Sequence, residues 1–273
     1  MNWRLLLTPP APGAWNMAVD EAILESIGRG ASLPTLRLYA WTPACLSLGV
    51  AQPFADVDAA RLRARGWDAV RRITGGRAIL HTDELTYSVI GPAENPILAG
   101  SVLESYSRIA KALLRAVQDL GMSVEMKEKD DVGQVTNLSR SNPVCFEVPS
   151  TYEITVDGKK LIGSAQARRK DGVLQHGSLP LVGDLTRITD ALTFADESAR
   201  ADAAARLLAR AATVESALGR AATWDDAARA MVRAFEAELG IQFERGDLSP
   251  VESTRADELV REKYGNPEWT ERV

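Results

Sequence analysis

The feature that most constrains the fold is the stretch of residues 71–81, in which a turn with paired glycines separates two apolar runs. Residues 67–72 lead into Gly75 and Gly76, and residues 78–80 lead away from them. Paired glycines can adopt positive φ angles and let the backbone approach a neighbouring group closely, and the flanking arginines attract anions. Two interpretations follow from this stretch alone: a turn that binds an anion or ligand, or a hairpin turn with solvated arginines. In either case the glycines join two strands of one sheet.

Strand patterns, in which apolar and polar residues alternate, recur through residues 1–182. The other expected strands are residues 3–7, 35–41, 44–50, 84–90, 123–127 and 173–182, together with a hairpin over residues 150–166 that turns at Asp157 and Gly158. A helical spacing of apolar residues predicts helices at residues 16–27 (with Asn16 as N-cap), 56–65, 101–120, 198–218, 223–239 (with Thr223 as N-cap) and 253–264. The polar residues 127–142 are interpreted as a surface loop or a lid.

This order of elements, with strands first and helices afterwards, is typical of an α/β or α+β layer protein. We expect one mixed β-sheet flanked by helices, with the residues after Asp184 packed against it as a helical C-terminal annex. No stretch has the composition of a linker, so we expect a single domain over residues 1–273. Its core is expected at about residues 30–248, and a C-terminal helix and tail at residues 249–273.

Composition and charge disfavour several classes of function. The formal net charge of −5 argues mildly against nucleic acid as the main partner. No apolar run approaches the length of about 20 residues that a transmembrane helix needs. The first residues, up to Pro9, do not have the pattern of a signal peptide. We therefore expect a cytoplasmic protein that binds neither nucleic acid nor a membrane.

The chain has only two cysteines, Cys45 and Cys145, and two histidines, His81 and His176. A lone cysteine pair in such a chain is seldom a disulfide, and the spacing of these four residues suits zinc poorly. We expect no metal site. Cys45 lies inside a strand pattern, which predicts a small buried core residue.

Cys145 is a candidate nucleophile. It lies between Pro143 and Pro149, where irregular backbone would leave the thiol accessible. A thiol becomes a nucleophile when a neighbouring cation favours the thiolate, and Lys159 and Lys160 follow in the next hairpin. Strand alternation directs these lysines to opposite faces, and Lys160, farther from the exposed turn, is the better inward candidate. The alternative is a solvated hairpin lysine.

Small residues lie in the second strand of this hairpin, and a histidine lies in the strand that follows it. Gly163, Ser164 and Ala165 have the size that a strand running past a ligand requires. His176 stands beside Gly177 and is either a base for the thiol or a strand histidine with satisfied hydrogen bonds.

Taken together, these motifs resemble those of the lipoate–protein ligase, octanoyltransferase and biotin ligase superfamily. The resemblance covers residues 3 to about 183, and several ordered motifs at similar spacing make it specific. The segments that carry it are residues 16–22 and 46–52 (the N-terminal segments), 71–88 (the ligand loop), 158–166 (the lysine hairpin) and 175–178 (the following strand).

Arg77 and Cys145 indicate the branch of the superfamily. Arg77 stands where ATP-using lipoate ligases tend to carry a small residue, and those ligases need no cysteine nucleophile. Residues 143–150 look like the cysteine-dependent octanoyltransferase branch of lipoate assembly. The resemblance implies a biotin/lipoate-ligase α/β fold. It implies the transfer of an octanoyl group from octanoyl-acyl carrier protein, through a thioester on Cys145, to a lysine of a lipoyl domain such as the glycine-cleavage H protein.

The resemblance also implies roles for individual residues. Cys145 and Lys160 would be catalytic, and no cofactor is implied, because transfer from a thioester to an amide is downhill without ATP. The residues implied for substrate binding are Arg72, Gly75, Gly76, Arg77, His81, Gly163, Ser164, Ala165 and His176. Apolar residues around Ile79 and Ile162 either line an octanoyl tunnel or belong to the core.

Three other functions stay open. The first is an ATP-dependent lipoate–protein ligase, in which Arg71, Arg72 and the glycine turn hold an acyl-adenylate. The second is an octanoyl amidotransferase that acts between lipoyl domains. The third is a non-catalytic binder of lipoyl domains. A reactive Cys145 would distinguish the octanoyltransferase hypothesis from the ligase hypothesis.

Overall fold

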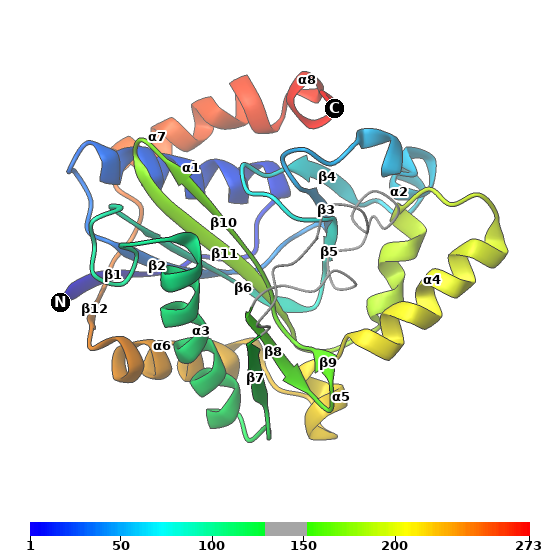
Figure 1. The fold of residues 1–273 in the computed structure, drawn as a ribbon. Helices are drawn as coiled ribbons and strands as arrows, with labels where there is room; N and C mark the ends of the chain where they lie inside the picture. Colours follow the sequence, from blue (N-terminus) through cyan, green and yellow to red (C-terminus); the bar gives the residue numbers. More distant parts are fainter. Residues whose placement is uncertain (129–151) are drawn as a thin grey trace.

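The structure, a computed structural model, describes residues 1–128 and 152–273. Cys145 and most of the expected polar loop therefore lie outside the described residues. The described strands form three sheets, and helices cover both faces of the largest one (Figure 1).

The largest sheet has six strands in the order β10-β11-β6-β2-β1-β12. Strand β1 pairs in parallel with β2 and β12, and the other neighbours are antiparallel, so the sheet is mixed as expected. The strands are β1 (Asn2–Leu7), β2 (Thr35–Tyr39), β6 (Glu84–Gly91), β10 (Gly163–Arg169), β11 (Gly172–Pro180) and β12 (Gln242–Arg245).

A second sheet has three strands, with β3 (Cys45–Leu48) between β4 (Asp68–Arg71) and β5 (Ile79–His81). β3 is parallel to β4 and antiparallel to β5. The glycine turn therefore joins two strands of one sheet, as predicted. It is not a hairpin turn, because the strands that it joins lie on opposite sides of β3. This arrangement depends on pairing with a distant segment, which the turn sequence does not encode.

The third sheet is antiparallel and consists of β7 (Glu125–Glu128), β8 (Tyr152–Val156) and β9 (Lys159–Lys160). The predicted hairpin turn is confirmed, since Asp157 and Gly158 both have positive φ, of 49° and 75°. This is the conformation that two-residue hairpin turns of type I′ require. After Lys160 the chain leaves this sheet, and β10 begins the edge of the six-stranded sheet.

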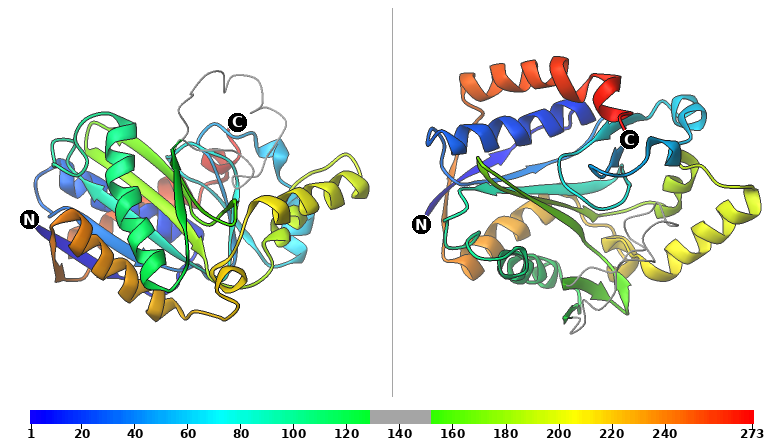
Figure 2. Two further views of the ribbon diagram at one scale, coloured as in Figure 1. Left: turned by 60° about the horizontal axis from the view of Figure 1, so that its bottom comes forward. Right: turned by 45° about the horizontal axis from the view of Figure 1, so that its top comes forward.

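The helices form layers on both faces of the six-stranded sheet (Figures 1 and 2). α1 and α7 lie on one face, and α3 and α6 lie on the other. The helices are α1 (Gly13–Gly28), α2 (Ala59–Ala64), α3 (Val102–Asp119), α4 (Glu197–Arg210), α5 (Val214–Leu218), α6 (Trp224–Leu239), α7 (Pro250–Leu259) and α8 (Pro267–Thr270). Short 3-10 turns occupy Phe54–Asp56 and Leu185–Ala191, and a π-helical turn, Val260–Tyr264, extends α7.

The helix α3 follows directly from its sequence. The Ser101 hydroxyl accepts a hydrogen bond from the Glu104 backbone N–H, and the Glu104 carboxylate accepts one from the Ser101 N–H, which forms a capping box. Ile109, Leu113 and Val117 repeat at helical spacing and are buried in the main core with α6 and the sheet.

Two details of the helix prediction are wrong. Asn16 does not cap α1, which begins at Gly13. The buried Asn16 amide instead donates to the carbonyls of Ala11 and Ala40. The helix expected over residues 198–218 is divided into α4 and α5, because the chain becomes extended at their junction and a new capping box begins α5. The predicted N-cap of α6, Thr223, is confirmed.

The C-terminal part of the chain is more than a helical annex. α6 contributes Phe235 and its neighbours to the main core, and β12 adds an edge strand next to β1. β12 was not among the strands expected from the sequence. The division at residue 249 stays a prediction.

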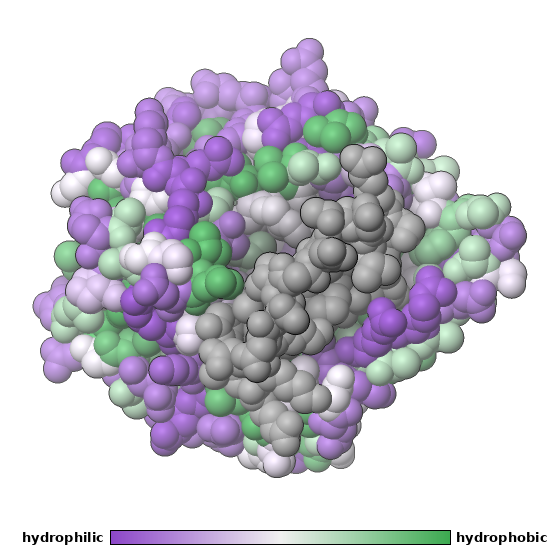
Figure 3. All heavy atoms as spheres, in the orientation of Figure 1, coloured by the Kyte–Doolittle hydropathy of each residue, from purple (hydrophilic) through white to green (hydrophobic). Residues whose placement is uncertain are grey.

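The face shown in Figure 3 is mainly hydrophilic between scattered hydrophobic side chains. This agrees with the few large hydrophobic residues that are exposed in the described ranges, such as Leu33, Leu208 and Val251. Among the helices that the structure describes, none combines the length and the apolar composition that crossing a membrane requires.

Candidate functional site

A pocket lies where the six-stranded sheet meets the three-stranded sheet. Six of the predicted site residues line it: Arg72, His81, Gly163, Ser164, Ala165 and His176. They come from β5, β10 and β11 and from the segment after β4, so tertiary structure brings together residues more than 100 positions apart. The other residues that line the pocket are Met17, Tyr39, Trp41, Ser47, Ile79, Thr86, Gly177 and Ser178.

The glycine turn borders this pocket through Arg72. Gly75, Gly76 and Arg77 are not among the residues that line the pocket. The Arg72 Nη2 atom donates to the carbonyls of Gly75 and Arg77, at 2.8 Å each. Gly76 has a φ of 93°, which favours glycine.

Arg71 and Arg72 are not solvated, so the interpretation of this stretch as a hairpin turn with solvated arginines is wrong. Arg71 and Arg72 are both buried. Arg71 donates to the carbonyls of Gly49, Gln52 and Thr270, at 2.9, 2.6 and 2.9 Å. Arg71 therefore connects β4 to the C-terminal segment and does not face the pocket.

His81 is held on both sides of its ring. Its Nδ1 atom lies 2.6 Å from Glu84 Oε1, and its Nε2 atom lies 2.7 Å from Ser47 Oγ. The ring stacks on Trp41, with 3.9 Å between centroids. Burial raises the pKa of Glu84, but His81 and the hydroxyls of neighbouring residues outweigh it, and the pKa lies below its usual value. Glu84 is therefore ionised at neutral pH.

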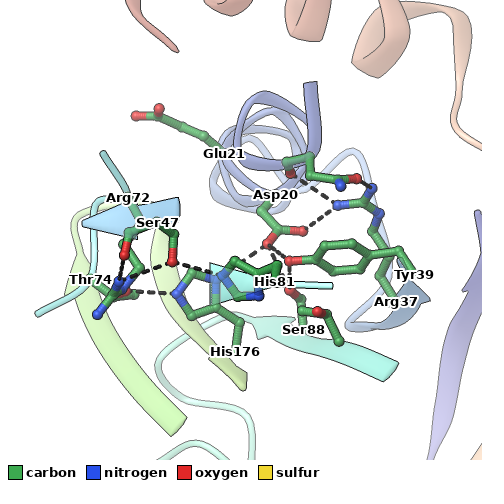
Figure 4. A network of polar contacts seen from close by, with 12 residues as sticks. Asp20, Glu21, Arg37, Tyr39, Ser47, Arg72, Thr74, His81, Ser88 and His176 are labelled. Atoms are coloured by element: carbon green, nitrogen blue, oxygen red, sulfur yellow. Dashed lines mark hydrogen bonds and ion pairs between the residues drawn. The ribbon is translucent and has the colours of Figure 1, made fainter. Parts of the chain in front are cut away.

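His176 has a similar environment on β11, as Figure 4 shows. Its Nε2 atom lies 2.7 Å from Thr74 Oγ1, and its Nδ1 atom lies 3.5 Å from Asp20 Oδ2. Burial lowers the pKa of His176 below its usual value, although Asp20 opposes this shift. His176 is therefore neutral at pH 7.

Asp20 is the centre of a buried polar network beneath the pocket (Figure 4). Its carboxylate accepts hydrogen bonds from Arg37 at 2.8 Å, Tyr39 at 3.1 Å and Ser88 at 2.6 Å. Burial raises the pKa of Asp20, but Arg37 and His176 outweigh it and the pKa is lowered. A buried ion pair needs such additional hydrogen bonds to compensate for desolvation.

Asp20, Arg37 and Glu84 were not among the site residues predicted from the sequence. A signal was present for Arg37, which stands between Leu36 and Leu38 of an expected strand. A charged residue at a position expected to be buried indicates a partner across the core.

Lys160 points inward, as strand alternation predicted. It is 6% exposed, whereas Lys159 is partly exposed. Lys160 is not among the residues that line the pocket. Its predicted partner, Cys145, lies outside the described residues, so the pairing stays a prediction. Cys45 is buried in the core as expected, and burial raises the pKa of its thiol well above the usual value.

Over residues 1–128 and 152–273, no group of three or more His, Cys, Asp or Glu side chains is placed to hold a metal ion.

Comparisons with known proteins show what this chain is similar to. The model of the lipoyl protein ligase A/B catalytic domain family matches residues 12–236. The octanoyltransferase LipM of Kyrpidia tusciae is 39% identical over 272 residues, which is 99% of each chain. LipM of Moorella thermoacetica is 40% identical over 272 residues, covering 99% of this chain and 98% of the relative.

Solved structures of lipoate ligases share the fold. A bipartite lipoate protein ligase from Thermoplasma acidophilum, reported with its E2 lipoyl domain, superposes with a TM-score of 0.82 at 25% identity, over 99% of this chain and 96% of that one. A lipoate–protein ligase A bound with ATP superposes with a TM-score of 0.80 at 26% identity, over 99% of both chains. The expected fold is therefore confirmed as that of the lipoate ligases.

Proposed function

Because the chain belongs to the lipoyl protein ligase A/B catalytic domain family, we propose that it is an octanoyltransferase of lipoate biosynthesis. The observation that carries this proposal is the identity of about 39% to octanoyltransferases over 99% of the chain. The similarity to ATP-bound lipoate ligase A is lower, at 26%. An acyltransferase of this kind modifies a lysine of a lipoyl domain.

The proposed reaction has two steps. The thiolate of Cys145 attacks the octanoyl thioester of an acyl carrier protein, a new C–S bond forms, and the carrier leaves as its thiolate. The amine of the acceptor lysine then attacks the Cys145 thioester, the C–S bond breaks, and the Cys145 sulfur leaves and takes up the proton that the amine loses as the amide forms. The first step is close to isoenergetic and the second is downhill, so neither needs ATP.

Lys160 is proposed to stabilise the thiolate of Cys145 by its charge. Its inward orientation supports this role, because a buried ammonium interacts more strongly with a nearby anion than a solvated one. The hairpin position of Lys160 is also fixed: its carbonyl accepts a hydrogen bond from Ala212 N at 3.0 Å.

The pocket is proposed to hold the acyl group. Met17, Trp41 and Ile79 give it apolar walls that suit a hydrocarbon chain. The small residues Gly163, Ser164 and Ala165 line it as well. Backbone amides of the glycine turn are proposed to stabilise the oxyanion.

The proposal is tested by the formation of the acyl-enzyme. We expect octanoyl-acyl carrier protein to add one octanoyl group to the protein, seen by intact mass and released by hydroxylamine. Cys145→Ala should abolish the adduct, and Cys45→Ala, a matched change at the buried cysteine, should keep it.

Two results would redirect the assignment. If no adduct forms but ATP and lipoate modify a lipoyl domain, the chain is a lipoate ligase. If octanoyl transfer occurs only from an octanoylated lipoyl domain, it is an amidotransferase.

A further inference from the structure

The five N–H groups of the Arg72 guanidinium all point at protein oxygens. Nε donates to Thr74 Oγ1 at 3.1 Å. Nη1 donates to the carbonyl and the hydroxyl of Ser47, at 2.9 and 3.1 Å. Nη2 donates to the carbonyls of Gly75 and Arg77. The buried guanidinium therefore holds the glycine turn through hydrogen bonds to Thr74, Gly75 and Arg77.

The two hydroxyls that hold Arg72 are each connected to a histidine. Ser47 Oγ lies 2.7 Å from His81 Nε2, and Thr74 Oγ1 lies 2.7 Å from His176 Nε2. Because each hydroxyl accepts an N–H from Arg72, its own proton is available for the imidazole. Both hydroxyls can donate to their imidazoles only when both Nε2 atoms are unprotonated, so that each neutral histidine carries its proton on Nδ1.

A buried carboxylate faces each Nδ1 atom. His81 Nδ1 lies 2.6 Å from Glu84, and His176 Nδ1 lies 3.5 Å from Asp20. Each carboxylate thus selects the Nδ1-protonated tautomer of its histidine. Two chains of the same chemistry, from carboxylate to imidazole to hydroxyl, therefore end at Arg72. Figure 4 shows His176 between Thr74 and Asp20.

We propose that Asp20 and Glu84 are positioning residues of this site. Through His176 and His81 they orient the two hydroxyls that fix Arg72, and thereby hold the glycine turn in one conformation. The two histidines would then act through the turn rather than as bases for the thiol.

The topology explains why such a support is needed. Asp20 lies on α1 and His176 on β11 of the large sheet, whereas Thr74 belongs to the turn of the small sheet. The pocket lies between the two sheets, and the contact of Thr74 with His176 connects the turn to the wall that β11 supplies. Backbone amides stabilise an oxyanion best when they are aligned before the reaction. The effect on oxyanion stabilisation rests on the proposed function, whereas the conformation of the turn can be measured on the protein without any substrate.

The test is amide hydrogen exchange of a peptide that covers residues 72–78, measured by mass spectrometry. Thr74→Val removes the hydroxyl at nearly constant volume, and we expect exchange about tenfold faster, as for a lost buried hydrogen bond. Thr74→Ser keeps the hydroxyl and should restore slow exchange to within about twofold.

The two carboxylates are tested in the same way. Glu84→Gln and Asp20→Asn should each speed exchange of the turn, by about threefold or more. Ser88→Ala removes a different hydrogen bond of Asp20 and should leave the turn unchanged. Because Asp20→Asn leaves Arg37 without its ion pair, circular dichroism must first show that this variant is folded.

In the octanoyl-transfer assay, Glu84→Gln should lower kcat about fivefold with a smaller change in KM for the donor, since the turn amides would stabilise the oxyanion in the transition state. Unchanged exchange of the turn in folded Glu84→Gln and Thr74→Val proteins would overturn the proposal, as would equally fast exchange in Ser88→Ala. If the wild-type protein transfers no octanoyl group, the exchange data still decide whether the two carboxylates hold the turn.

Discussion

A Cβ atom built on Gly49 would lie 2.0 Å from the carbonyl oxygen of Gly76, so the end of β3 and the glycine turn touch through their backbones. Val50 N donates to the Thr74 carbonyl at 2.9 Å beside this contact. Gly49 is required because of this close approach and not because of a positive φ. One wall of the candidate site therefore depends on a residue that precedes the turn by a whole strand and helix.

This contact predicts opposite results for two glycine variants. Gly49→Ala should lower the free energy of unfolding by about 1–3 kcal/mol, because the methyl group has to displace backbone. Gly75→Ala should be tolerated, since its Cβ would meet no atom within 4 Å. Urea unfolding of both variants checks this. Equal stability of the two would contradict the close approach. Loss of octanoyl transfer in a stable Gly75→Ala protein would indicate that Gly75 contacts the substrate.

Lys160→Ala should raise the pKa of the Cys145 thiol, because a neighbouring cation favours the thiolate. The measurement is the rate of alkylation by iodoacetamide as a function of pH, with the modified cysteine identified by peptide mapping. The midpoint should move to higher pH in Lys160→Ala and stay in place in Lys159→Ala. An identical profile for both variants and the wild type would reject Lys160 as the partner of the thiolate.

Because of Glu252, the free energy of unfolding should depend on pH in the acid range. Burial raises its pKa, but hydrogen bonds from Arg4, Ser249 and Ser32 outweigh this and lower the pKa from 4.5 to about 2. A lowered carboxyl pKa stabilises the folded state fully above 4.5, and this contribution disappears as the pH falls from about 4.5 to about 2. The stability difference between wild type and Glu252→Gln should therefore be larger at pH 6 than at pH 3 in urea titrations. A difference that does not change with pH would show that the carboxylate is not ionised more readily in the folded state.

Arg71→Lys should destabilise the protein although the charge is kept. Arg71 donates from Nε and Nη1 to carbonyls on both sides, and a lysine ammonium cannot reach this set of acceptors with one planar group. We expect a loss of about 2 kcal/mol in urea unfolding. Arg272→Lys, at an exposed position of the same C-terminal segment, should change stability by less than about 0.5 kcal/mol. Similar losses in both variants would contradict the role assigned to Arg71.

One part of the candidate site was predictable from the sequence, namely the residues whose type and local motif indicate a binding site. The sequence indicated His81, His176 and the small residues from Gly163 to Ala165, and these do line one pocket. It did not indicate Asp20 or Glu84, because the role of a buried carboxylate depends on which residue faces it across the core. The interpretation in which Arg71 and Arg72 are solvated, one of the two that the sequence left open, was wrong for the same reason: they donate to carbonyls of distant segments.

The sequence by itself determined the local elements. The Asp157 and Gly158 turn, the Ser101 capping box and the Thr223 cap each involve only residues within four positions of one another. The interactions that form them are therefore all present within a short segment of the chain. Only the tertiary structure decided that β3 lies between β4 and β5, and that β12 completes the large sheet. It also decided that two carboxylates reach Arg72 through two histidines. These pairings join residues far apart in the chain, and their stability comes from burial and complementary hydrogen bonds that exist only after the sheets have packed together.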